Sequence, residues 1–390
     1  MKGFYLLFFC VIMFFTSKAQ APLDSAAVQQ RYTEALERIN AYQFDRALEL
    51  LSTCYIQDQQ NKEYLIRMAY CHFQLGRYPD AKLFYNAVLK QDSLHTQAIS
   101  SLGSIFEREN NHREALRYYI YWASIDSTNS FAFKRGGYTA IRSGLGTEGI
   151  LYFLKAHELN SADIETIDQL SSLYIQSEQL DYAESVLRSG LNIDPNNIRL
   201  LQNKARLFNK KRDYPTVIQA IEKTMAQGDT SEYYQMMVAV AYLQLDSLDK
   251  AITNLEHIVT RKEDTEHTHQ YLGLAYRKKG DAEKSIQHFE TAIEKGISGK
   301  MHSYYGDLGA IYEEKGDYRK AITHYQKAYE YEPQAEYVFF QARNNDLAYK
   351  DKRIALKQYE QYLATKDPKF KEYAEQRIQQ IKELMHFIQK

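Results

Sequence analysis

The sequence predicts an all-α fold built from stacked helical hairpins. Its composition favours helix, because the 390 residues include 17 Gly and 6 Pro, the two residue types that disfavour helix most strongly. An internal period of 34 residues runs through most of the chain, which is typical of repeat proteins. Residues that end and begin helices recur at one phase of this period. Each repeat is therefore expected to hold two helices joined by a turn.

Small residues recur at a fixed phase and set the register of the period. Successive members lie 34 residues apart, with one step of 36 between Ser285 and Ala321. The series is Ala47, Ala81, Ala115, Gly149, Ala183, Val217, Ala251, Ser285, Ala321 and Ala355. A large apolar residue follows each of them after four residues, on the same helical face. A second small residue stands twelve positions earlier in most repeats, which allows two helices to approach closely.

The turns between the paired helices share a local chemistry. Residues that tolerate a left-handed helix C-cap recur at one phase: Gly76, Asn110, Gly144, Asp246, Gly280 and Gly316. The next position often offers an N-cap for the second helix: Asn111, Asp213, Ser247, Asp281 and Asp317. The local signals and the period therefore predict the same boundaries.

Residues 316–333 closely resemble the consensus of the tetratricopeptide repeat family. The resemblance covers about Ala26–Pro368, although Arg343 and Asp346 stand where small and aromatic residues are usual. It implies a right-handed superhelical solenoid of about ten helix-turn-helix units over residues 24–368. A two-residue insertion near 296–300 predicts a local change in superhelical pitch. Residues 369–390 repeat apolar residues at helical spacing and are expected to form a C-terminal capping helix.

The first residues differ from the rest of the chain. An uninterrupted apolar run at 4–15 follows Lys2 and precedes the small residues Ser17 and Ala19, the layout of a signal peptide. The run is much shorter than the roughly 20 residues of a transmembrane helix. We expect residues 1–19 to be a signal peptide, cleaved after Ala19, and the mature chain to be periplasmic or extracellular without stable membrane insertion.

The family resemblance implies a partner-binding groove formed by the first helix of each unit. Its groove-facing phase indicates Tyr32, Leu36, Ile66, Tyr70, Phe73, Lys134, Tyr138, Ile141, Gln202, Arg206, Met236 and Arg277. Aromatic side chains at this spacing also suit packing between units, and that alternative stays open. The family's two-carboxylate clamp for chaperone C-termini needs Lys and Asn on successive turns of a first helix. Four residues after Lys134, where the clamp would need Asn, the chain has Tyr138. We therefore exclude such chaperone partners.

No pattern of residues indicates catalysis or cofactor binding. The chain has no CxxC, HExxH or GxSxG motif, and His267 and His269 are two residues apart, so on a helix they face different sides. We therefore predict no enzyme activity, no catalytic or metal-binding residue, no cofactor and no small-molecule substrate. Lys and Arg total 49 against 50 Asp and Glu, so no one-signed field favours nucleic acid as a partner.

Two features leave alternatives open. Cys54 and Cys71, the cysteines after the signal segment, are either two buried thiols or, in an exported protein, a disulfide. The basic stretch 199–212 is either an exposed helix face or a site for an acidic partner segment.

The function predicted from these features is an extracytoplasmic interaction scaffold. It would bind partner peptides or helices in its concave groove, as part of a cell-envelope, secretion or surface-assembly complex. The alternative is a regulatory or sensory subunit that modulates a separately encoded envelope enzyme or transmembrane kinase.

Overall fold

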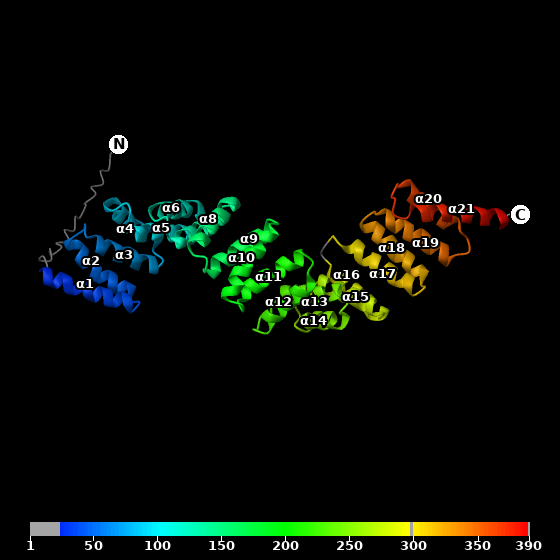
Figure 1. Ribbon diagram of the computed structural model, residues 1–390, viewed down its shortest axis with the longest axis horizontal. Coiled ribbons are helices and arrows are strands. Elements are labelled where there is room, and N and C mark those ends of the chain that lie inside the picture. The colour runs from blue at the N-terminus through cyan, green and yellow to red at the C-terminus, as the bar shows by residue number, and fades with distance from the viewer. Residues whose placement is uncertain (1–23, 297–298, 389–390) are drawn as a thin grey trace, which may run out of the picture. The chain divides into compact units, whose positions relative to one another are not determined.

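The computed structural model describes residues 24–296 and 299–388 and shows helices linked by short turns (Figure 1). Within these ranges the regular structure is α-helical and contains no strand. The all-α fold predicted from the sequence is therefore confirmed. The predicted signal peptide lies outside the described residues.

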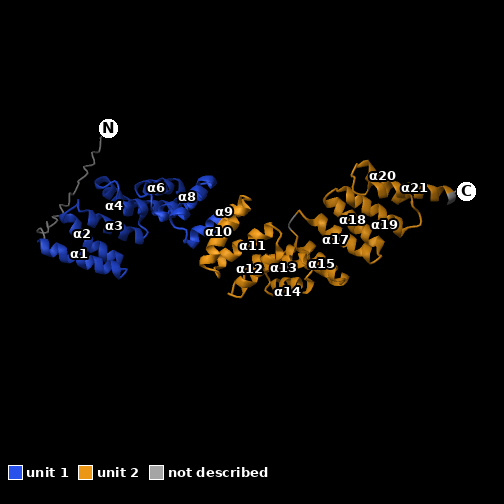
Figure 2. Cartoon of the chain, in the orientation of Figure 1, with its two compact units in different colours: residues 1–170 blue, residues 171–390 orange. Residues whose placement is uncertain are grey.

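The chain divides into two compact units, residues 1–170 and 171–390 (Figure 2). The helices of the first unit are α1 (Ser25–Asn40), α2 (Phe44–Gln57), α3 (Lys62–Gln74), α4 (Tyr78–Gln91), α5 (Thr96–Arg108), α6 (His112–Ile125), α7 (Ser130–Arg142) and α8 (Gly146–Leu159). Helix α9 (Ile164–Gln176) spans the boundary. The second unit continues with α10 (Leu180–Ile193), α11 (Ile198–Lys210), α12 (Tyr214–Met225), α13 (Glu232–Gln244), α14 (Leu248–Thr260), α15 (Glu266–Lys279), α16 (Ala282–Lys295), α17 (Met301–Glu314), α18 (Tyr318–Tyr331), α19 (Ala335–Ala348), α20 (Arg353–Ala364) and α21 (Lys371–Ile388).

The two series of recurring residues meet inside the hairpins. A Cβ atom on Gly103 of α5 would lie 2.9 Å from the ring of Tyr119 on α6, and one on Gly309 of α17 would lie 2.8 Å from the ring of Tyr325 on α18. Both rings are buried. The small residue of the first helix therefore makes room for the large residue of the second helix, as the spacing predicts.

The turns adopt the predicted left-handed conformation. All six of the predicted residues have positive φ, between 53° at Asp246 and 85° at Gly280. Three residues at the same phase, Tyr42, Glu178 and Arg212, also have a φ of 59°, although their side chains do not favour it. Four of the five predicted N-cap side chains accept a backbone hydrogen bond, whereas the side chain of Ser247 makes no capping bond.

The interior consists of separate apolar clusters that neighbouring hairpins share. One cluster joins α1, α2 and α3 through residues such as Ala35, Leu51 and Met68. Cys54 and Cys71 are both buried and free in the structure. Burial raises the pKa of the Cys71 thiol to about 12, which keeps it protonated and unreactive. Of the two alternatives, the structure therefore shows two buried thiols.

The last hairpin, α19 with α20, shares one apolar cluster with α21. Asp346 of α19 is 5% exposed and receives hydrogen bonds from Arg377 of α21, with Nε at 2.5 Å. Phe370, just before α21, stacks on Phe339 of α19 with ring centroids 4.2 Å apart. Helix α21 thus packs against α19 of the last hairpin. Residues 297–298 of the insertion lie outside the described residues, and the change in pitch stays a prediction.

Candidate functional site

Several of the predicted groove residues of the first unit pack against other side chains of that unit. Ile66 is 3% exposed and belongs to a core cluster. The ring of Tyr32 lies 5.1 Å from that of Tyr64, and the ring of Tyr70 lies 6.1 Å from that of Phe44. The remaining apolar residues of the set in this unit, Leu36, Phe73 and Ile141, are half-buried. Ile66 is therefore inaccessible to a partner in this structure, and for the others partner binding stays a prediction.

Lys134 and Tyr138 of α7 contact the start of α9 in the first unit. Lys134 Nζ lies 2.9 Å from Asp163 Oδ2 and 2.8 Å from Glu165 Oε2. The hydroxyl of Tyr138 donates a hydrogen bond of 2.9 Å to Glu165 Oε1. Burial, and then the bond to Glu165, raises the pKa of Tyr138 above its ordinary value. These two side chains are thus held by intramolecular partners.

The predicted residues of the second unit lie on different helices. Gln202 of α11 donates to Asp229 at 2.9 Å, Arg206 donates to Asn203 at 2.9 Å, and Met236 of α13 is half-buried against a core cluster. Arg277 of α15 alone among the twelve predicted residues lines the groove described below. For the other predicted residues of this unit, partner binding stays a prediction.

Two cations of the basic stretch 199–212, Lys210 and Lys211, form ion pairs within the chain. Lys210 pairs with Glu178, and Lys211 lies 2.7 Å from Glu184 and 3.2 Å from Asp181. Because these cations already have partners within the chain, the structure favours an ordinary charged helix surface over a site for an acidic segment.

A groove of about 640 Å³ lies in the second unit, on α15, α17, α18 and α19. Small residues of α17 line it, namely Ser303, Gly306 and Ala310, and their spacing places them on one helical face. A Cβ atom on Gly306 would lie 3.0 Å from the ring of Tyr337 on α19. The aromatic side chains of Tyr337 and Phe340 line the groove from α19. The groove therefore combines small and aromatic residues on facing helices.

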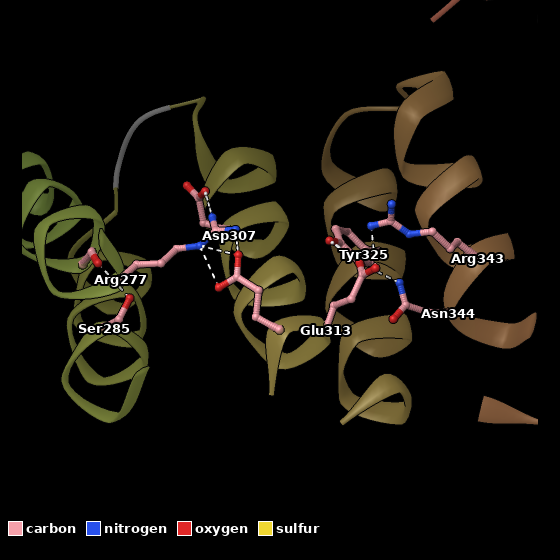
Figure 3. Close-up of polar contacts among 9 residues, drawn as sticks. Arg277, Ser285, Asp307, Glu313, Tyr325, Arg343 and Asn344 are labelled. Atoms are coloured by element: carbon pink, nitrogen blue, oxygen red, sulfur yellow. Dashed lines mark hydrogen bonds and ion pairs between the residues drawn. The ribbon is translucent and has the colours of Figure 1, made fainter. Parts of the chain in front are cut away.

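One guanidinium links α15 to two carboxylates of α17 (Figure 3). Arg277 Nη2 lies 2.5 Å from Glu314 Oε1, while Arg277 Nη1 lies 3.4 Å from Asp307 Oδ1. Burial raises the pKa of Asp307 to about 6, with Arg277 opposing the shift and Glu314 adding to it. Burial alone would lower the pKa of Arg277, but its bond with Glu314 and the neighbouring negative charges raise it. Arg277 therefore stays charged.

A third carboxylate of α17, Glu313, connects this helix to α18 and α19 (Figure 3). Its Oε1 lies 2.5 Å from Arg343 Nη2, and its Oε2 accepts hydrogen bonds from Asn344 Nδ2 at 2.9 Å and from the Tyr325 hydroxyl at 3.2 Å. Burial, followed by the charge of Glu313, raises the pKa of Tyr325. Arg343 also covers the ring of Phe340, with 5.2 Å between the guanidinium carbon and the ring centroid.

Sequence reasoning missed most of this groove. Asp307, Glu313, Glu314 and Arg343 were not predicted, and Arg277 was nominated without its partners. The available signal was the departure of Arg343 from the family pattern, because a long cation at a position usually occupied by a small residue needs a counter-charge nearby. The Arg343–Glu313 pair supplies it.

The described residues contain no group of three or more His, Cys, Asp or Glu side chains arranged to hold a metal ion. His269 is 6% exposed and lies 2.9 Å from Asp264, whereas His267 lies 3.5 Å from Lys300. The two histidines thus point to different partners, as their spacing predicts. Across the described ranges no helix has both the length and the apolarity that crossing a bilayer requires.

Comparison with known proteins identifies the repeats. Family models described as tetratricopeptide repeat match residues 38–105 and 264–331. The chain is 23% identical over 209 residues to a DnaJ homolog subfamily C member 7 homolog from Dictyostelium discoideum, covering 49% of this chain and 38% of the relative. It is 19% identical to the TPR repeat-containing protein YpiA from Bacillus subtilis, and the alignment covers 66% of this chain and 53% of YpiA. The chain thus spans about half the length, or less, of these curated relatives.

A tetratricopeptide repeat protein from Parabacteroides merdae is a similar solved structure. It aligns with 18% sequence identity and a TM-score of 0.46, covering 65% of this chain and 99% of that one.

Proposed function

Because the chain belongs to the tetratricopeptide repeat family, we propose that it is an extracytoplasmic scaffold that binds a segment of a partner protein in the groove on α15, α17, α18 and α19. Proteins of stacked helical hairpins are interaction scaffolds, because each hairpin leaves one helix available to line a continuous surface. The observation that carries the proposal is the groove of about 640 Å³ with small residues on α17 and aromatic residues on α19.

The chemistry of the groove suits a polypeptide segment. Ser303 and Ala310 present small side chains on α17, so that the backbone of a partner can approach the helix closely at these positions. Tyr337 and Phe340 provide apolar area, and aromatic side chains of this kind serve as anchors at interfaces. Charged groups in the middle and at the C-terminal end of α17, Asp307 and Glu313, supply the polar contacts that orient a bound segment.

The extracytoplasmic part of the proposal is supported by the apolar run at 4–15 and by Ser17 and Ala19. We expect the mature protein to begin at Gln20, because a signal peptidase reads small residues at the positions before its cleavage site. N-terminal sequencing of the protein purified from the exported fraction tests this. A mature chain that retains residue 1, recovered from the cytoplasm, would contradict it.

The groove is tested by filling it. Ser303→Trp places a large side chain in the groove, whereas Gln287→Trp places the same side chain on the exposed surface of α16. We expect affinity capture from the exported fraction to recover the same partner with the wild type and with Gln287→Trp, and to lose it with Ser303→Trp. Circular dichroism checks that both variants fold. Recovery of the partner by folded Ser303→Trp would exclude this groove as the binding site.

A further inference from the structure

The arginines that line the groove are already bound by carboxylates. Arg277 makes three hydrogen bonds to Glu314, between 2.5 and 3.3 Å. Arg343 lies 2.5 Å from Glu313, a carboxylate that Asn344 also holds. An anionic segment would have to displace one of these carboxylates before it could bind either guanidinium, and the displaced carboxylate would then lack a partner.

Asp307 is compensated less well. It lies 3.4 Å from Arg277 Nη1, whose guanidinium makes its shorter contacts with Glu314. One cation therefore serves two carboxylates. Glu336, which also lines the groove, is paired with Lys369 at 2.6 Å. The excess negative charge of the groove thus lies beside Asp307, whose side chain is 22% exposed.

The surroundings of Asp307 suit a long cationic side chain. The ring of Tyr337 covers Gly306, the neighbour of Asp307 in the chain, and both Tyr337 and Asp307 line the groove. A Lys or Arg side chain has an apolar stem that packs along such a surface while its charged end reaches a carboxylate. Aromatic faces add an attraction for the cation itself.

From these contacts we propose that the segment bound in the groove is cationic, and that a Lys or Arg side chain of the partner pairs with Asp307 between α15 and α19. This inference rests on the proposed function of the groove. It concerns the charge of the occupant and is independent of the identity of the partner protein.

Two peptides of equal length and aromatic content test the proposal. One carries Lys and the other Glu at alternate positions, and fluorescence anisotropy measures their binding to the full mature chain. We expect the Lys peptide to bind at least about tenfold more tightly than the Glu peptide, and Asp307→Asn to weaken its binding about tenfold, because one close charge pair is lost. Asp249→Asn is the matched control, since Asp249 is an exposed carboxylate that pairs with Lys279 outside the groove. This control should leave binding unchanged.

The outcomes separate the inference from the proposed function. Equal loss of affinity in Asp307→Asn and Asp249→Asn would show non-specific attraction and overturn the inference. Tighter binding of the Glu peptide, or no binding of either peptide at about 1 mM, would also overturn it. The proposed function fails separately, if folded Ser303→Trp still recovers the protein partner.

Discussion

At the scale of single residues, the turns show how stacking imposes a backbone conformation. Nine positions at one phase of the described repeats have positive φ. Four of them are Gly, and the other five carry a side chain in spite of this conformation. Gly280 has no atom within 4 Å of an added Cβ, so its requirement is conformational and does not arise from crowding. A residue with a side chain costs roughly 1–2 kcal/mol in this region. Arg212 adopts this costly conformation. We attribute this to the packing of α11 and α12 on either side, which determines the path of the chain.

We expect Arg212→Gly to raise the free energy of unfolding by about 1 kcal/mol. Glycine removes the backbone strain at this turn, and the strain is larger than the additional conformational entropy that glycine loses on folding. Gly280→Ala, at the equivalent turn, should lower it by a similar amount. Urea denaturation followed by circular dichroism measures both. If Arg212→Gly destabilises the protein, the positive φ at that turn carries no strain.

Asp307 shows how a site residue can oppose stability. Its pKa in the folded protein, about 6, lies above the ordinary value of 3.8, so folding favours the protonated form. The stability associated with this group is complete below the ordinary pKa and is lost as the pH rises through about 6. A carboxylate kept at this cost is consistent with a role in binding, because function often retains groups that stability alone would remove.

Asp307→Asn should therefore stabilise the protein by on the order of 1–3 kcal/mol at about pH 7.5. Asn stays neutral, so the difference from the wild type should shrink as the pH falls toward about 4. Denaturation curves at the two pH values provide the measurement. An equal gain at both values would show that the effect does not come from titration of Asp307.

At the scale of helices, the two small-residue series match the size of the residues they face. Glycine faces an aromatic ring in four hairpins, Gly103 with Tyr119, Gly137 with Phe153, Gly273 with Phe289 and Gly309 with Tyr325, where an added Cβ would lie 2.8 to 2.9 Å from the ring. Alanine occupies the same phase before Leu51, Ile221 and Leu255. Ala69, which precedes Tyr85, and Arg343, which precedes Tyr359, are exceptions. The distance between paired helices is thus set by the combined volume of two side chains.

Gly273→Ala should lower the free energy of unfolding by about 1–3 kcal/mol, because the ring of Phe289 is fully buried and cannot move away. In the double variant with Phe289→Leu, the cost should be less than the sum of the two single changes, since the smaller side chain leaves room for the methyl group. A double-mutant cycle by urea denaturation measures this coupling. Additive effects would show that the two residues do not share a tight contact.

At the scale of the whole molecule, stability is distributed along the chain. The apolar clusters of the described residues each involve a few neighbouring helices. In such a stack the last hairpin would expose one apolar side unless another element covers it. Helix α21 does so, because Ala374 and Ile381 are buried in the same cluster as Phe339 and Tyr359. Its outer side carries exposed charges such as Lys371 and Glu375.

Removal of residues 369–390 should expose this cluster and remove the Arg377–Asp346 pair. We expect a lower unfolding temperature and concentration-dependent self-association, because the exposed apolar surface can be buried by contact with a second copy of the chain. Light scattering coupled to size-exclusion chromatography compares the truncated and mature chains. A truncated chain that stays monomeric at high concentration would show that α21 is not needed as a cap.

The sequence by itself determined the helices, their pairing into repeats, the positions of the turns and the phase of the buried residues. These properties depend on interactions within one repeat of 34 residues, so the sequence of a single repeat is enough to predict them.

Only the tertiary structure showed which residues line the groove. Arg277 reaches Asp307 and Glu314 over 30 and 37 residues, and Arg343 reaches Glu313 on another helix. Which charges meet depends on how side chains of three successive first helices extend across the space between them, and periodicity within a single repeat contains no information about that.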